Sequence, residues 1–406
     1  SPGNSSGSAC VFTRDLSVGS TGAEVTALQN ALKAGGYMAA NATGNFGPLT
    51  KAGVVAWQNA KGITPAAGYF GPKSRAAFCG ANPGTGPGTI PVTGTGLKVM
   101  LSPTSPNGTA LVQGQAAAEL AQFTFANPTA SPINVTNLTF KRIGVSNDST
   151  LTNVYLYSGA VRLTDSAGVS NSSFNFNSAS GLFTVGSGMT YTISVRSDIA
   201  GSTSGQQIGA SLVAVTSSGT LDGSVSFPIM GGLQTISAAT LANVDLGVTT
   251  LPSASTVDPQ SDYTVWQNTV TVGTRAVLLK SFALRNIGSV QGGDVVNYRL
   301  YVDGVSVGQT VNRFDGNNMV TFDLSANPVR LETGGRVMKV VADVVGGASR
   351  TFQMSLRYAA DALFYDTDLN QPILVRGDGS SITATFAAHS ATSATINSVS
   401  TSAPSV

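Results

Sequence analysis

The stretch "GNFGPLTKAGVVAWQ", residues 44–58, is answered further along by "GYFGPKSRAAF", residues 68–78. Both begin with Gly-x-Phe-Gly-Pro, a phrase that occurs nowhere else in the 406 residues. Glycine permits a sharp turn, and proline fits the first turn of a helix, where its missing N–H would have had no partner anyway. We therefore expect two helices to begin near Pro48 and Pro72, each entered through a turn anchored by a phenylalanine.

A further helix is expected before the first of these phrases. Thr21 and Glu24 have the T-x-x-E spacing of a capping box. Val25, Leu28 and Leu32 then recur on one helical face. Because two glycines follow this pattern, the helix is expected to end there. The segment is thus predicted to hold three helices.

The order of these features closely resembles the bacterial peptidoglycan-binding domain found at the ends of many cell-wall hydrolases, over residues 11–79. The matching positions are Leu16, Gly19, Ser20, Gly22, Val25, Leu28, Gln29, Leu32, Gly36, Tyr37, Gly44, Phe46, Gly47, Thr50, Trp57, Gln58, Gly62, Gly71, Pro72 and Ser74. One stretch, residues 38–43, departs from the family because it carries no charge and lacks the usual Pro or acidic residues. The resemblance implies a small three-helix domain at residues 10–80 that binds peptidoglycan.

The resemblance also implies where the ligand lies. We expect a shallow groove beside the two entry turns, with Asn45, Thr50, Tyr69 and Arg75 as contacts to glycan or stem peptide. Arg75 is either the partner of a stem-peptide carboxylate or a solvated charge on its helix.

The only two cysteines, Cys10 and Cys79, bracket this segment. A structural zinc site needs about four ligands, and the chain has one histidine, His389, far away in sequence. We interpret the pair as a disulfide, with two free thiols as the alternative. A disulfide implies an oxidising, extracytoplasmic setting.

Composition narrows the classes of function. Charged residues make up 10% of the chain, against roughly 25% in an average soluble protein. With a net charge of +2, the chain has no basic surface for nucleic acid. No apolar run approaches the roughly 20 residues of a membrane-spanning helix. The first ten residues lack the pattern of a signal peptide, so we expect any such peptide to have been removed. These features favour an extracellular protein of the bacterial cell surface or cell wall.

The rest of the chain is predicted to be β-sheet. Residues 1–9 are assigned as an N-terminal tail, and the Pro-, Gly- and Thr-rich residues 81–97 as a linker. From there on, apolar residues alternate with polar ones, as in strands with one buried face. We expect two immunoglobulin-like β-sandwiches, at residues 98–235 and 236–379, and a C-terminal strand or tail at residues 380–406. The fold class is therefore multidomain and mainly β.

The two predicted sandwiches resemble each other in sequence. "NVYLYSGAVRL", residues 153–163, aligns with "NYRLYVDGVSV", residues 297–307, which places Tyr157 beside Tyr301. A second alignment places Asp198 beside Asp343. Asp303 is followed by glycine, and this pair between valines predicts a two-residue hairpin turn. In general character, the modules resemble those of bacterial surface-layer and adhesin proteins.

Catalytic motifs are not found in the sequence, so an enzyme is not expected and no cofactor is implied. "YDTDLN", residues 365–370, offers Asp366, Asp368 and Asn370 at alternate positions. This spacing is interpreted either as a calcium site or as a solvated loop.

We expect a non-catalytic structural protein of the cell surface, anchored to peptidoglycan and assembled with copies of itself into a surface layer or extracellular filament. Residues 380–399 contain a strand-like alternation that would pair either with a neighbouring copy or within its own module. The alternatives are a monomeric adhesin and an accessory part of a cell-wall hydrolase.

Overall fold

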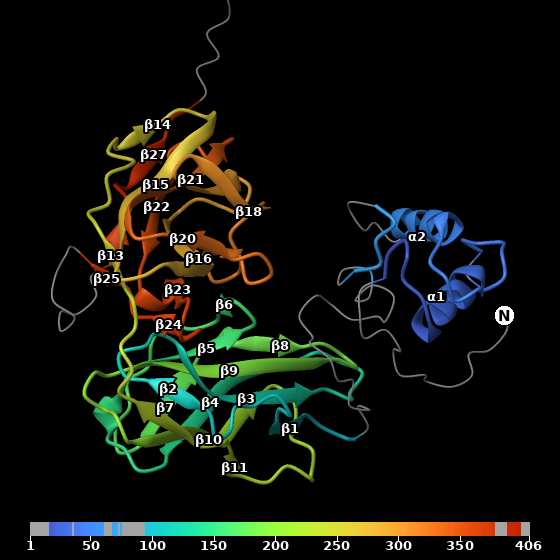
Figure 1. The fold of residues 1–406 in the computed structure, drawn as a ribbon, viewed down its shortest axis with the longest axis horizontal. Helices are drawn as coiled ribbons and strands as arrows, with labels where there is room; N and C mark the ends of the chain where they lie inside the picture. The colour runs from blue at the N-terminus through green and yellow to red at the C-terminus, as the bar shows by residue number, and fades with distance from the viewer. Residues whose placement is uncertain are drawn as a thin grey trace, which may run out of the picture.

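The computed structural model describes residues 16–34, 36–60, 67–71, 74, 94–377 and 388–398. It is a mainly β, multidomain structure with two short helices near the N-terminus (Figure 1). Five of the predictions concern residues outside these ranges. They are the N-terminal tail, the Cys10–Cys79 bond, Arg75, most of the linker, and the alternation within residues 380–387.

The N-terminal module contains helix α1 (Ala23–Ala34) and helix α2 (Pro48–Ala60). The entry to α2 at its proline is as predicted. The third helix, expected from Pro72, is not confirmed, because only Gly71 and Ser74 of that segment are described. The described part of the module therefore has two helices instead of three.

The core of the N-terminal module joins both helices to both Gly-x-Phe-Gly turns. The segment before α1 runs past the two turns, with Leu16 bridged to Phe70 and Thr21 bridged to Asn45. The buried core consists of Leu16, Val25, Leu28, Leu32, Met38, Phe46, Val54, Trp57 and Phe70. Trp57 lies against Phe70, with 5.9 Å between ring centroids. Each turn is thus attached to the core by its phenylalanine.

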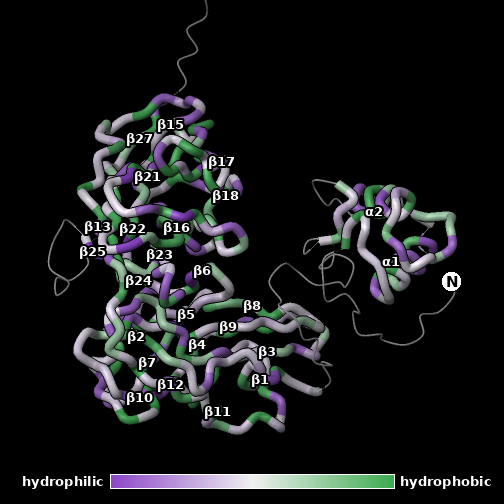
Figure 2. The backbone as a smooth tube through the Cα atoms, in the orientation of Figure 1, coloured by the Kyte–Doolittle hydropathy of each residue, from purple (hydrophilic) through white to green (hydrophobic). Residues whose placement is uncertain are grey.

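Residues 94–237, called module 1, pack two sheets around one hydrophobic core. The first sheet has the order β1 (Lys98–Leu101), β3 (Ala118–Ala126), β9 (Thr190–Ile199), β5 (Leu151–Ser158) and β6 (Val161–Arg162). The second has the order β2 (Ala110–Val112), β12 (Gln234–Ser237), β10 (Gln207–Ser217), β4 (Ile133–Ile143) and β7 (Ser173–Asn177), with β8 (Phe183–Val185) on β4 and β11 (Ile229–Met230) on β10. A short 3-10 helix, η1 (Asp148–Thr150), precedes β5. Apolar residues recur along these strands between polar ones (Figure 2).

Residues 238–377 and 388–398, called module 2, repeat this architecture around a second core. One sheet has the order β18 (Val305–Val311), β17 (Val295–Val302), β21 (Gly334–Val344), β15 (Gln260–Gly273), β13 (Asn243–Leu246) and β25 (Arg376–Gly377). The other has the order β14 (Thr256–Val257), β27 (Ala394–Ile396), β22 (Thr351–Leu356), β16 (Val277–Gly288), β23 (Ala362–Asp366) and β24 (Pro372–Ile373). Outside this order, β19 (Met319–Asp323) and β20 (Val329–Leu331) pair with β16, and β26 (His389–Ser390) pairs with β22.

Strand pairing confirms the sequence repeat. Tyr157 is paired with Arg162 in the β5–β6 hairpin, and Tyr301 is paired with Ser306 in the β17–β18 hairpin. The parallel pair β2–β12 of module 1 has its counterpart in the parallel pair β14–β27 of module 2. The β14–β27 pair also shows that residues 394–396 pair within their own module.

The two modules differ in one strand. In module 1, β10 is continuous and pairs with β4 from Gly209 to Ser217, with local register shifts. In module 2, β16 pairs with two shorter strands, β22 and β23. Between them lies η2 (Ala359–Asp361), a single 3-10 turn. This turn faces module 1.

The contact between the modules is buried and partly polar. The Arg162 guanidinium donates from Nε and Nη2 to the two carboxylate oxygens of Asp361, at 2.7 and 3.1 Å. The Tyr157 hydroxyl donates to the Ala360 carbonyl at 3.1 Å. A small apolar cluster surrounds these contacts: Ala116, Ala117, Tyr155, Tyr157, Ala360 and Leu363. Removing one partner of a buried ion pair is costly, so this contact helps to hold the two modules together.

No helix in the described part of the chain is long and apolar enough to cross a membrane.

Candidate functional site

The first Gly-x-Phe-Gly turn is held by one buried glutamine. Gln29, on α1, is 2% exposed. Its side-chain oxygen accepts from the backbone N–H groups of Thr43 and Gly44, at 2.8 and 2.9 Å. Its side-chain nitrogen donates to the Asn45 carbonyl and to the Thr50 hydroxyl, both at 2.8 Å. One amide group thus satisfies the backbone of the turn and the first turn of α2.

The second turn is held in the same way. Gln58, on α2, is also 2% exposed. Its oxygen accepts from the Gly68 N–H at 2.9 Å. Its nitrogen donates to the Tyr69 carbonyl and the Ser74 hydroxyl, both at 2.8 Å. The repeat therefore extends two residues beyond the proline, to Thr50 in the first copy and Ser74 in the second. The hydroxyl at this position accepts a hydrogen bond from the buried glutamine.

Glycine is required at the first position of both turns. Gly44 has φ +72° and Gly68 has φ +73°, in the region that side chains disfavour. A Cβ at Gly68 would also come within 2.5 Å of the Lys51 side chain. These constraints explain why the first residue of each phrase is glycine.

The structure separates the four predicted peptidoglycan contacts. Asn45 and Tyr69, the second residues of the two turns, are both exposed, Tyr69 by 46%. Thr50 is 2% exposed, and its hydroxyl faces Gln29 inside the module. Arg75 lies outside the described residues. The turns thus present Asn45 and Tyr69 to solvent, whereas Thr50 holds a turn in place.

Sequence reasoning matched Gln29 and Gln58 to the family pattern but gave them no role. The available signal was their position, since each follows a core residue, Leu28 or Trp57, on its helix. A glutamine beside a core position is usually read as exposed. Only the structure, in which each turn covers its glutamine, shows that Gln29 and Gln58 are buried.

The predicted calcium ligands all lie beside cations of the protein. Asp366 is buried and ion-paired with Arg275 at 2.7 Å. Burial alone would raise the pKa of Asp366, but Arg275 and the N–H groups of the loop outweigh it and lower the pKa to about 2. Asp368 lies 3.5 Å from Arg275, and Asn370 accepts from Lys280 at 2.9 Å. In the described residues, no group of three or more His, Cys, Asp or Glu side chains is arranged to hold a metal ion. The calcium site stays a prediction that these contacts do not favour.

The chain was compared with curated proteins, with solved structures and with protein families. A search of curated proteins found no match. Among solved structures, the chain is similar to the C-terminal domain of the Streptococcus agalactiae AgI/II polypeptide BspA, with 10% identity over 69% of this chain and 97% of that one and a TM-score of 0.17. It is also similar to the C-terminal domain of the Streptococcus pyogenes antigen I/II-family protein AspA, with 8% identity over 69% and 97% of the two chains and a TM-score of 0.20.

A third structure is the serine-rich repeat adhesion glycoprotein Srr1 of Streptococcus agalactiae, with 9% identity over 64% of this chain and 90% of that one and a TM-score of 0.17. The family comparison concerns the N-terminal module, where the turns and their glutamines lie. Residues 21–77 match the family described as putative peptidoglycan binding domain.

Proposed function

We propose that this chain is a non-catalytic protein of the bacterial cell surface, attached to peptidoglycan by its N-terminal module. The observation that carries the proposal is the family match over residues 21–77 together with two intact, glutamine-held turns. The turns give the module a fixed surface on which Asn45 and Tyr69 are exposed.

The β modules support a structural role within this proposal. They make up most of the described chain, and their mutual contact includes a buried ion pair. We propose that the two sandwiches, of immunoglobulin-like type, form the part of the protein that extends from the wall. Assembly of many copies into a layer or filament belongs to the same proposal. A monomeric adhesin is the alternative.

The wall-binding proposal is tested by sedimentation with purified sacculi. We expect the full-length chain to pellet with the sacculi. Replacing Tyr69→Ala or Asn45→Ala should raise the dissociation constant by roughly fivefold or more, since truncating a central contact residue costs above about 1 kcal/mol. The matched control is Asn30→Ala, an exposed position on α1.

Two results would count against the proposal. A full-length chain that stays entirely in the supernatant would exclude wall attachment. A clearing band in a zymogram with embedded cell walls would instead identify a hydrolase.

A further inference from the structure

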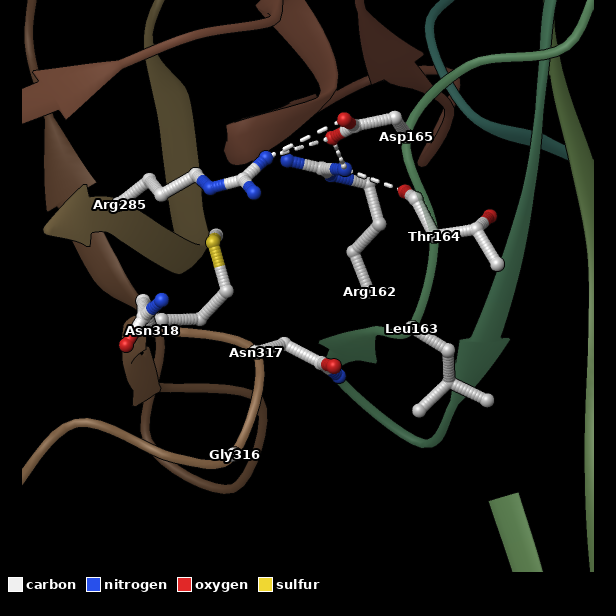
Figure 3. Close-up of a pocket in the computed structure, with 9 residues that line it drawn as sticks. Arg162, Leu163, Thr164, Asp165, Arg285, Gly316, Asn317 and Asn318 are labelled. Atoms are coloured by element: carbon white, nitrogen blue, oxygen red, sulfur yellow. Dashed lines mark hydrogen bonds and ion pairs between the residues drawn. The ribbon is translucent and has the colours of Figure 1, made fainter. Parts of the chain in front are cut away.

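A polar cavity of about 240 Å³ lies where the two β modules meet (Figure 3). Module 1 contributes the residues from Arg162 to Asp165, at the end of β6 and just after it. Module 2 contributes Arg285 on β16 and the residues from Gly316 to Met319 at the start of β19. The cavity therefore exists only when the modules are joined.

Charge is concentrated beside this cavity. The chain has 22 basic and 20 acidic residues among 406, yet five of them gather here. Asp165 lies 2.9 Å from Arg285, 3.5 Å from Arg162 and 3.9 Å from Arg357. Arg162 also pairs with Asp361. Three arginines against two aspartates leave a local excess of one positive charge.

Only part of this cluster is needed to join the modules. The Arg162–Asp361 pair is almost completely buried, with side chains 4% and 1% exposed. The Arg285 side chain is 29% exposed and that of Asp165 is 51% exposed. Partly exposed pairs contribute about 0–1 kcal/mol or less to stability. The partly exposed pair between Arg285 and Asp165 thus adds little to the stability of the joint.

Several polar groups around the cavity have hydrogen-bonding capacity left over. Arg285 bonds to Asp165 only through Nη1, and within the described residues its Nε and Nη2 have no partner. The side-chain amides of Asn317 and Asn318 likewise have no hydrogen-bond partner in the described part of the chain. Figure 3 shows the Arg285 guanidinium and the Asn317 amide directed into the cavity. Met319 supplies an apolar wall.

We propose that this cavity binds a small ligand through a carboxylate. The free edge of the Arg285 guanidinium takes the carboxylate, because planar guanidinium and carboxylate groups form paired, charge-assisted hydrogen bonds. The amides of Asn317 and Asn318 bind the polar remainder of the ligand. The negative charge of Asp165 does not oppose this, since three arginines surround it. Peptide C-termini and acidic sugars both carry the required group.

Met319 provides a direct readout, because it lines the cavity. The full-length chain, labelled with ¹³C in its methionine methyl groups, is titrated with two matched pairs of probes. One pair is N-acetyl-alanyl-alanine and its C-terminal amide, and the other is glucuronate and glucose. We expect a saturable shift of the Met319 signal with the acid of at least one pair and none with its uncharged partner. Met230, exposed on β11 of module 1, serves as the remote control signal.

Two variants test the assigned contacts. Arg285→Gln should weaken binding of the acid roughly tenfold or more, since charge-assisted hydrogen bonds are lost. Asn317→Ala, whose side chain has no described partner to lose, should weaken it roughly threefold. Arg330→Gln, an exposed arginine outside the cavity, should have no effect. Any one of three results would overturn the proposal. They are no shift of the Met319 signal with either acid, an equal shift with the uncharged partner, and unchanged affinity in Arg285→Gln.

Discussion

At the scale of single residues, Asp198 and Asp343 occupy equivalent positions in the two modules, but their pKa values are shifted in opposite directions. Asp343 accepts from Arg299 at 2.6 Å, and this contact, with Asn297 and a backbone N–H, lowers the pKa of Asp343 to about 2. In module 1, Tyr155 stands at the position equivalent to Arg299 and donates to Asp198 at 3.1 Å. Asp198 is buried and has no ion pair within the described residues, and burial raises its pKa to about 6.

The first prediction at this scale concerns pH. Because the folded-state pKa of Asp198 lies above its ordinary 3.8, the folded protein holds this proton more tightly than the unfolded chain. The resulting stabilisation is complete below about pH 4 and is lost as pH rises through about 6, an effect of up to about 3 kcal/mol. Asp198→Asn removes the titration.

The measurement is the free energy of unfolding in denaturant from pH 4 to pH 8. We expect the wild type to lose stability relative to Asp198→Asn as pH rises. The other carboxylates, present in both proteins, cancel in the difference. A difference that stays constant across this range would contradict the assignment.

At the scale of elements, the 3-10 turn η2 is what distinguishes module 2. It interrupts the strand that is continuous as β10 in module 1, and it brings Asp361 to Arg162. Tyr358, which precedes the turn, lies under the Arg162 guanidinium, 4.5 Å from its carbon to the ring centroid. The turn thus supplies a carboxylate, a carbonyl and an aromatic ring to the other module.

We predict that Asp361→Asn separates the unfolding of the modules. It removes the buried partner of Arg162 and leaves only the half-exposed Asp165 at 3.5 Å, so we expect a cost of up to about 3–5 kcal/mol, as for a broken buried pair. Calorimetry should show a single transition for the wild type and two transitions, or one broadened transition, for the variant. The control Arg330→Gln breaks an exposed pair and should change stability by less than about 1 kcal/mol. An unchanged single transition in Asp361→Asn would show that the ion pair does not couple the modules.

Local patterns in the sequence predicted several elements correctly. The entry to α2 and the β17–β18 hairpin depend on neighbouring residues, and Asp303 and Gly304 have the positive φ values, +49° and +80°, that the predicted turn requires. The η2 turn was not predicted, because its sequence continues an apolar strand pattern. Its partner Arg162 lies 199 positions away. Contacts between residues far apart in the sequence, such as this one and those of Gln29 with its turn, leave no pattern among neighbouring residues.

At the scale of the whole molecule, the proposed assembly needs a surface other than the C-terminal segment 389–396. β26 and β27 already pair within module 2, where Trp266 donates to the His389 carbonyl at 3.0 Å. Removing everything after residue 379 would therefore take strands from the module itself. A chain that ends at Ser398 keeps these strands and is the appropriate variant.

We predict that the full-length chain forms ordered polymers at high concentration. Electron microscopy and sedimentation velocity over a concentration series, with and without Ca²⁺, provide the measurement. Loss of polymers in the chain ending at Ser398 would assign assembly to the terminal residues. Monomers at every concentration, in both chains, would favour the adhesin alternative.

The joint between the modules is asymmetric, because each module supplies a different half of it. Module 1 has no counterpart of η2, and at the position of Arg162 module 2 has Ser306. Neither half of the joint is therefore present a second time, although the modules share a fold. A further module joined to either one would therefore need a different kind of contact from the one between Arg162 and Asp361.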